Sequence, residues 1–132
     1  MITAVDSSVL LDVLVVGSTD AVRSYQAVHE AREAGRVVVC PVVWAEVCAV
    51  FEHPGEMAAL TDAGIEFDPF DQEVSQMAGS LWKSYRGKGG RRTRLIPDFL
   101  VAAHALVRAD ALLSRDRGFS RRYFSKLKLI TP

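Results

Sequence analysis

The sequence is poor in the features that mark secreted, membrane-bound and zinc-binding proteins. It has only two cysteines, Cys40 and Cys48, and three histidines, and none of them shows the paired Cys/His spacing of a zinc site. No apolar run approaches the roughly 20 residues of a membrane span, and the first residues lack the basic and apolar segments of a secretion signal. We therefore expect a cytoplasmic protein with no membrane segment, in which both cysteines are small buried thiols.

Net charge is also absent, because 16 Lys and Arg residues balance 16 Asp and Glu residues. Any attraction to a polyanion must then come from the local placement of basic residues. Hydrophobic residues make up 49% of the chain and charged residues 24%, which is typical of a folded soluble protein rather than a disordered one. At 132 residues the length fits one domain, so residues 1–132 are expected to form a single unit around one core.

Short apolar segments alternate with helical patterns along the chain. The expected strands are 2–5, 36–40, 65–70, 109–116 and an edge strand at 126–130. Helices are expected from Ser7, over 19–34, from Pro41, over 56–63, from Asp71, from about Pro97 and over 119–124. Strands separated by helices imply crossover connections, so the predicted fold class is α/β, with a mainly parallel central sheet of four to five strands flanked by helices.

Three aspartates lie where open parallel sheets bind their ligands, beyond the carboxyl ends of the strands. Asp6 ends the first expected strand, Asp116 follows the strand that contains ALLS, and Asp98 opens the helix near Pro97. Each aspartate alone is equally typical of a helix cap, a first helical turn or a turn. Their shared placement is what makes them candidates for one site.

Glu46 is harder to explain as a structural residue. It is the one charged residue in the apolar run 41–51, and no cation lies three or four positions away. We expect its helix to be buried against the sheet, with Glu46 reaching the acidic edge from the N-terminal half of that helix. Asp12, which lies among leucines and valines on the first helix, is expected on the solvent face instead.

The four acids together predict a site for a divalent cation. Unpaired carboxylates in one pocket repel, which raises pKa values and destabilises the fold unless a cation binds. Mg²⁺ prefers oxygen ligands and needs neither His nor Cys, which argues against zinc. Such an ion can activate water and stabilise the leaving oxygen in phosphodiester hydrolysis.

Basic residues gather beside two of the four acids. The segment 86–94, RGKGGRRTR, carries five basic residues and no acid, and its glycines suggest a mobile loop. The candidates for contact with a polyanion are Arg91, Arg92, Arg94, Arg115 and Arg117. A solvated charged surface is the alternative for either basic run, and the nearby acids favour binding.

Four segments follow one another along almost the whole chain: VDSSVLLDVL, WAEV, IPDFLVAAHAL and LLSRDRGF. Their order and spacing resemble those of the PIN-domain ribonucleases, and in particular the VapC-type toxins of toxin–antitoxin pairs. The resemblance implies an endoribonuclease that depends on Mg²⁺ or Mn²⁺ and acts as the toxin of a type II toxin–antitoxin system.

The resemblance also implies roles for individual residues. The catalytic acids would be Asp6, Glu46, Asp98 and Asp116, with Asp6, Asp98 and Asp116 as metal ligands and the hydroxyls of Ser8 and Ser114 beside them. The implied partners are an RNA substrate, a cognate antitoxin that inserts a segment into the acidic site, and a second copy that forms a homodimer. Phe99 departs from the family, where a small or polar residue is common, and is expected to change how closely substrate approaches Asp98.

A non-catalytic module is the competing hypothesis. A PIN-like or receiver-like α/β domain would use its acidic pocket only to hold a cation or a partner's arginine. A receiver would need Asp68 as phosphate acceptor and a lysine after the next strand, and no lysine follows ALLS in that position. The histidines, His104 included, are expected to be structural. Transfer, ribosomal and messenger RNA all remain open as substrates.

Overall fold

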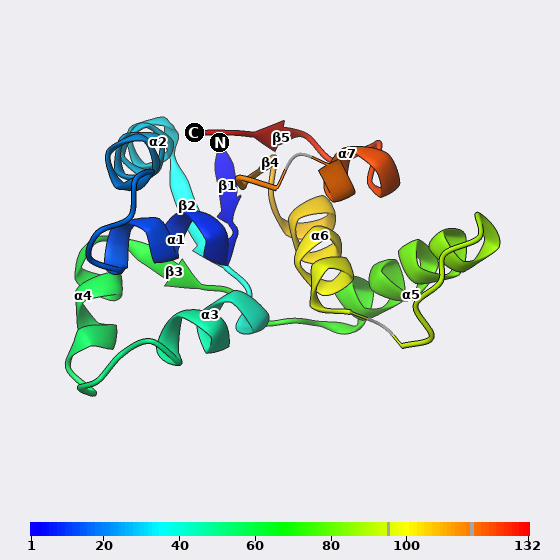
Figure 1. Cartoon of the computed structure of the whole chain (residues 1–132), viewed down its shortest axis with the longest axis horizontal. Helices are drawn as coiled ribbons and strands as arrows, with labels where there is room; N and C mark the ends of the chain where they lie inside the picture. The colour runs from blue at the N-terminus through cyan, green and yellow to red at the C-terminus, as the bar shows by residue number, and fades with distance from the viewer. Residues whose placement is uncertain (95, 117) are drawn as a thin grey trace.

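A parallel β-sheet forms the centre of the protein, which we describe from a computed structural model covering residues 1–94, 96–116 and 118–132 (Figure 1). Its strands are β1 (Ile2–Val5), β2 (Arg36–Val39), β3 (Ile65–Phe67), β4 (Ala111–Leu113) and β5 (Leu129–Ile130). They lie in the order β3-β2-β1-β4-β5, and every neighbouring pair is parallel. The predicted α/β class with a parallel central sheet is confirmed.

The strand order changes direction at β1. The chain first builds outward through β2 to β3 and then crosses back to place β4 and β5 on the other side. The boundary between β1 and β4 is therefore the topological switch point, where open α/β sheets bind ligands. Because the register pairs Val5 with Leu113, the residues that follow them, Asp6 and Ser114, leave the sheet side by side.

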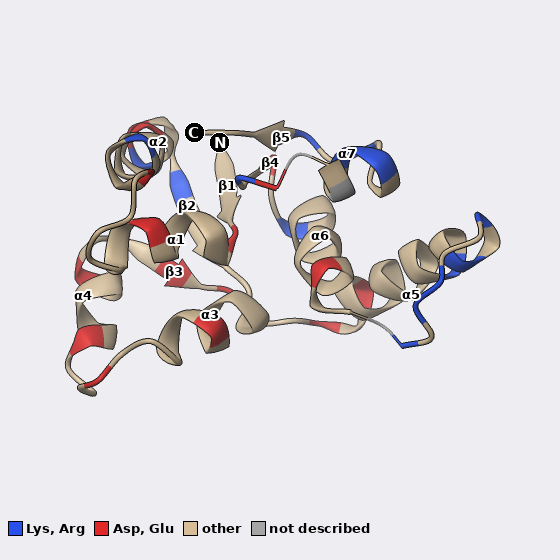
Figure 2. Ribbon diagram, viewed as in Figure 1, with Lys and Arg blue, Asp and Glu red and all other residues tan. Residues whose placement is uncertain are grey.

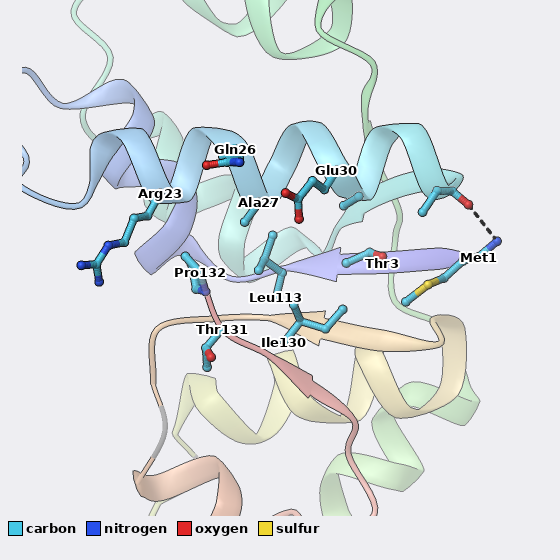
Figure 3. Close-up of a pocket in the computed structure, with 12 residues that line it drawn as sticks. Met1, Thr3, Arg23, Gln26, Ala27, Glu30, Leu113, Ile130, Thr131 and Pro132 are labelled. Atoms are coloured by element: carbon cyan, nitrogen blue, oxygen red, sulfur yellow. Dashed lines mark hydrogen bonds between the residues drawn. The ribbon is translucent and has the colours of Figure 1, made fainter.

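Helices cover both faces of this sheet. They are α1 (Ser7–Leu14), α2 (Ala21–Ala34), α3 (Pro41–Cys48), α4 (Glu56–Asp62), α5 (Gln72–Gly87), α6 (Pro97–Arg108) and α7 (Gly118–Tyr123). The helix α2 runs along one face and α6 along the other (Figures 1 and 3). Several helices begin at residues that favour a helix start. Pro41 and Pro97 occupy the first turns of α3 and α6, and the Asp71 carboxylate caps α5 by accepting the Val74 N–H at 2.9 Å.

Aliphatic side chains of the central strands form the main core, in which Val5, Val37 and Val39 are at most 1% exposed. A separate aromatic cluster lies between α5, α6 and α7. Its member Phe99 is fully buried, with its ring centroid 5.4 Å from that of Trp82. Phe99 therefore points into the protein and not over Asp98, so the effect on substrate approach expected for it has no support.

Both cysteines are free thiols, but only one is buried as expected. Cys40 is buried at the end of β2, whereas Cys48 is half-buried at the end of α3. Within residues 1–94, 96–116 and 118–132, no helix has the length and apolar character needed to cross a membrane.

Two hollows of the described surface lie away from the acids. One, of about 410 Å³, runs between α2 and the strands β1, β4 and β5 and is lined by Ala27, Leu113 and Ile130 among others (Figure 3). Another, of about 420 Å³, lies between α1, α2 and α4. Neither contains any of the four candidate acids.

Candidate active site

Asp6 is fixed at the carboxyl end of β1. Its backbone N–H extends the sheet by donating to the Leu113 carbonyl at 2.9 Å, and its Oδ1 caps α1 by accepting the Ser7 N–H at 2.9 Å. Its Oδ2 accepts hydrogen bonds from the hydroxyls of Ser8 and Ser114, each at 2.8 Å. Donors therefore hold both oxygens, which sets the orientation of the carboxylate.

The two serine hydroxyls also receive hydrogen bonds from the loop that follows β4. The Arg115 N–H donates to Ser8 Oγ at 3.2 Å, and the Asp116 N–H donates to Ser114 Oγ at 3.0 Å. Each hydroxyl thus bridges Asp6 to the loop. Ser8 and Ser114, the hydroxyls that the family resemblance implies beside the acids, both lie against Asp6.

Asp98 and Asp116 approach Asp6 from two other elements. Asp98 occupies the first turn of α6, where a carboxylate is favoured by the helix dipole. The Asp116 Oδ2 accepts a hydrogen bond from the Ser120 hydroxyl at 3.3 Å. The three aspartates line one narrow pocket of about 10 Å³ with Ser114 and Ser120, which is close to the space that a single water or small ion occupies.

The carboxylates influence one another electrostatically. The pKa of Asp98 is raised. The largest cause is partial burial, which removes water from the carboxylate, and the negative charges of Asp6, Asp116 and Glu46 add to it. Arg92 acts in the opposite direction and lowers the same pKa. Asp98 keeps exposed surface, so this repulsion arises at a site that solvent can reach.

The position of Glu46 differs from the expected one. The helix α3 buries Val43 and Val47, while Glu46 is exposed and is the sixth of the eight helical residues, in the C-terminal half. Its Oε2 accepts a hydrogen bond from the Ser7 hydroxyl at 3.0 Å. The expected burial of the helix was only partly right, because α3 packs Val43 and Val47 into the core beside α1 and α6 and leaves its Glu46 side toward solvent. Glu46 still approaches the acidic pocket, from the solvent side.

The prediction that Asp12 faces solvent was also wrong. Asp12 is 4% exposed and forms a bidentate ion pair with Arg115, at 2.6 Å from Nε and 2.9 Å from Nη2. Burial alone would raise the pKa of Asp12, but hydrogen bonds from Ser24, Ser18 and Arg115 hold it below its usual value. The Arg115 guanidinium is paired with Asp12 although its side chain is half-exposed, and its role in binding a polyanion stays a prediction.

The remaining candidates for contact with a polyanion are Arg91, Arg92, Arg94 and Arg117. Arg91, Arg92 and Arg94 are exposed and follow the end of α5, where basic residues gather in Figure 2. The charge of Arg92 reaches Asp98, as its effect on the pKa indicates. Arg117 lies outside the described residues.

The segment 88–94 is held against α5, although its glycines had suggested a mobile loop. The Arg86 guanidinium donates to the carbonyls of Gly90 at 3.1 Å and Arg92 at 2.6 Å. The Arg92 N–H donates to the Tyr85 hydroxyl at 3.4 Å. These contacts from the last turn of α5 give the basic segment a defined course toward Asp98.

Two serines near the acids were missed in the sequence. Ser7 is buried and orients Glu46, and Ser120 donates to Asp116. Ser7 directly follows Asp6, and Ser120 lies four residues after Asp116, which is a spacing that permits contact across one turn. These spacings are the features of the sequence from which the roles of Ser7 and Ser120 could have been predicted.

Asp68 is engaged elsewhere in the structure. Its Oδ2 lies 2.7 Å from Nε2 of the buried His104, and its Oδ1 accepts a hydrogen bond from Arg108 at 3.0 Å. His104 is therefore structural, as expected. A carboxylate held in this way is not a free phosphate acceptor, which removes support from the receiver-like hypothesis.

The residues of the pocket fit a divalent cation in their chemistry. They offer carboxylate and hydroxyl oxygens, and the like charges that raise the pKa of Asp98 would be offset by a cation. In the part of the chain that the structure describes, no three His, Cys, Asp or Glu side chains are gathered closely enough to hold an ion alone. Mg²⁺ commonly binds through one or two carboxylates, with water and substrate phosphate as its other ligands.

Comparison with known families identifies the class of protein. A model of the PIN domain matches residues 3–125, so the chain belongs to the PIN domain family. The family to which the sequence motifs pointed is therefore confirmed. A search of curated protein sequences gives no significant match.

Solved structures share the fold over nearly the whole chain. A chain of VapBC2 from Rickettsia felis, solved with a promoter DNA fragment, matches with a TM-score of 0.77 and 16% identity, covering 100% of this chain and 99% of that one. A VapBC-1 chain from nontypeable Haemophilus influenzae matches with 0.71 and 14% identity, over 99% and 98% of the two chains. A toxin–antitoxin complex from Klebsiella pneumoniae matches with 0.65 and 20% identity, over 98% and 97%.

Proposed function

We propose that the protein is an endoribonuclease dependent on Mg²⁺ or Mn²⁺ and acts as the toxin of a type II toxin–antitoxin pair, with residues 1–132 as one catalytic unit. Membership of the PIN domain family supports nuclease chemistry. The observation that carries the proposal is that Asp6, Asp98 and Asp116, from three separate elements, line one pocket, with Glu46 near enough to raise the pKa of Asp98.

Each acid would have a distinct task. Asp6, Asp98 and Asp116 would hold the cation together with water and substrate phosphate, and the bound cation would offset their charges, polarise the phosphate and lower the pKa of water. Ser8 and Ser114 orient Asp6 for this role through their hydrogen bonds to Oδ2. Glu46, tethered at Oε2 by Ser7, is placed on the solvent side, where it can take a proton from the attacking water.

RNA would be held by the basic segment beside the pocket. Arg91, Arg92 and Arg94 are exposed, and the course of their segment is set by Arg86. Guanidinium groups bind phosphate oxygens in two-point contacts, and such binding weakens as salt rises. Single-stranded loops of structured RNA are suitable substrates, since splayed phosphates reach a recessed site most easily.

The proposed partners are a cognate antitoxin and a second copy of this chain. The similar solved structures come from VapBC or other toxin–antitoxin complexes, which supports the antitoxin. The homodimer rests on the family resemblance. Co-expression with the product of a neighbouring small gene should give a complex that purifies intact and cleaves no RNA. A neighbouring product that neither binds the protein nor inhibits it would argue against the toxin role.

The nuclease activity is tested with RNA and the acid residues. Purified protein should cleave a susceptible RNA with Mg²⁺ or Mn²⁺, stop on addition of EDTA, and lose at least 1,000-fold in rate when Asp6→Ala and Asp98→Ala are combined, on the scale of lost catalytic groups. The matched control is Asp62→Asn, which changes an exposed carboxylate at the end of α4. Unchanged cleavage by the double variant would falsify the proposal.

A binding module would give a different result. It would bind Mn²⁺ or a partner's arginine at the acids, and no RNA would be cleaved under any metal condition. Metal binding measured by calorimetry beside the cleavage assay separates the two functions.

A further inference from the structure

An ion pair between a buried carboxylate and a half-exposed guanidinium lies just outside the acidic pocket. Asp12, in α1, pairs through both carboxylate oxygens with Arg115, at 2.6 Å and 2.9 Å. The hydroxyls of Ser24 and Ser18 donate to the same carboxylate at 2.6 Å and 3.1 Å. The pair therefore joins α1, the start of α2 and the loop after β4, which are distant in sequence.

Arg115 belongs to the loop that carries Asp116. Its side chain is tied to α1 through Asp12, and its backbone N–H is tied to Ser8, which in turn donates to Asp6. The next backbone N–H, that of Asp116, is tied to Asp6 through Ser114. The loop is thus fixed from both its side-chain and its main-chain sides.

Fold stability alone does not account for this arrangement. The Asp12 carboxylate is buried and gives up its hydration, and apolar residues in place of such a buried charged group are often equally or more stabilising. The ion pair instead fixes the orientation of Arg115. A planar guanidinium that donates to both oxygens of a fixed carboxylate can adopt only one geometry. An apolar contact allows sliding.

We propose that Asp12 and Arg115 are positioning residues, whose ion pair holds the 114–116 loop so that Asp116 and Ser8 keep their places around Asp6. The catalytic consequence rests on the proposed nuclease function. The geometric consequence does not, since every contact that supports it is between residues of the chain itself.

The first test is backbone amide exchange by NMR in metal-free protein. The variant combines Asp12→Asn with Arg115→Met, which removes both charges and keeps an oxygen for the Ser24 hydroxyl. The amides of Arg115 and Asp116 should exchange at least tenfold faster than in the wild type, while that of Val38, in β2, is unchanged. The matched control, Arg36→Met, removes the exposed Arg36–Glu66 pair (2.8 Å) and should alter neither loop amide.

The second test uses metal and cleavage. The double variant should need at least tenfold more Mn²⁺ for half-maximal binding and should cleave RNA at least tenfold more slowly, with a thermal midpoint near that of the wild type. If the double variant fails to fold, Arg115→Lys keeps the charge but loses the two-point grip and should show the same exchange effect. Wild-type exchange at Arg115 and Asp116 in a folded variant overturns the inference.

The outcomes separate the two proposals. Faster loop exchange in a protein that never cleaves RNA keeps the positioning role and rejects the nuclease function. The opposite outcome is RNA cleavage that depends on Asp6 and Asp98, together with wild-type loop exchange and Mn²⁺ binding in the variant of Asp12 and Arg115. That outcome keeps the nuclease function and rejects the positioning role.

Discussion

At the scale of single residues, Glu46 offers the clearest separation of function from stability. Its side chain is exposed and its contact with Ser7 is one hydrogen bond at 3.0 Å, so little of the fold depends on its charge. Glu46→Gln should slow metal-supported cleavage by about 100-fold, in the range of a lost general base, and change the free energy of unfolding by less than about 0.5 kcal/mol. Cleavage kinetics check the predicted loss of rate, and urea denaturation checks the predicted stability.

A companion variant tests how Glu46 is oriented. Ser7→Ala removes the hydroxyl that donates to Oε2 and should give a smaller loss of rate than Glu46→Gln. A large loss of stability in Glu46→Gln would instead mark the glutamate as a structural residue.

Residues whose partners are distant in sequence could not be predicted from the sequence. Asp12 lies 103 positions from Arg115, so nothing near it indicated the ion pair. The apolar neighbours of Glu46 pointed to burial, but burial is decided by which elements pack against α3. Asp6, by contrast, could be placed from local pattern because a strand end and a helix cap meet there.

At the scale of elements, the last turn of α5 determines where the basic segment lies. Gly90 packs so closely on the Tyr85 ring that an added Cβ would overlap it. The Tyr85 ring cannot move aside without losing packing contacts, because its centroid lies 5.3 Å from that of Trp82, on which it stacks, and 5.2 Å from that of Phe99. The course of the segment therefore depends on the absence of a side chain at position 90.

Gly90→Ala should therefore displace the segment that carries Arg92. We expect a loss of about 1–3 kcal/mol in the free energy of unfolding, as for overpacked sites, and weaker retention of RNA. Gly87→Ala is the matched control, because a Cβ at that position meets nothing within 4 Å. Thermal denaturation and RNA filter binding measure both. Equal effects of the two substitutions would show that the contact with Tyr85 does not matter.

The order of helices and strands could be predicted because each boundary has a local cause. Pro41, Asp71 and Pro97 mark helix starts, and alternation of apolar segments marks the strands. Element ends were less predictable. The third strand ends at Phe67 and not near residue 70, and α5 continues through Gly87 into the expected loop. Packing against neighbours decides those ends.

At the scale of the whole molecule, His104 makes stability depend on pH. Burial lowers the pKa of His104 below its ordinary 6.5, although Asp68 opposes the shift. The unfolded chain then binds a proton more readily than the folded one, so stability is full above about pH 6.5 and falls as the pH drops toward the folded pKa. The pKa of Asp68 is also lowered, by Arg108 and His104 against the effect of burial, so a further loss follows below its ordinary 3.8.

The free energy of unfolding should therefore fall as the pH drops below about 6.5, and His104→Gln should flatten that slope. Urea denaturation at several pH values gives the measurement. Because the pKa of Asp98 is raised, its ionisation lowers the free energy of unfolding as the pH rises above 3.8, which is opposite to the effect of His104. The quantity to compare is therefore the difference in slope between the wild type and the variant. Identical slopes in the two proteins would contradict the role given to His104.

The hydrogen bond between Asp6 and Ser114 joins residues 108 positions apart, across the pairing of β1 with β4. During synthesis, Asp6 leaves the ribosome long before the residues that surround it exist. Contacts between such distant segments also form late in folding. An unfinished chain therefore carries no assembled site, so under the proposed function no cleavage can begin before β4 and the loop after it have been made.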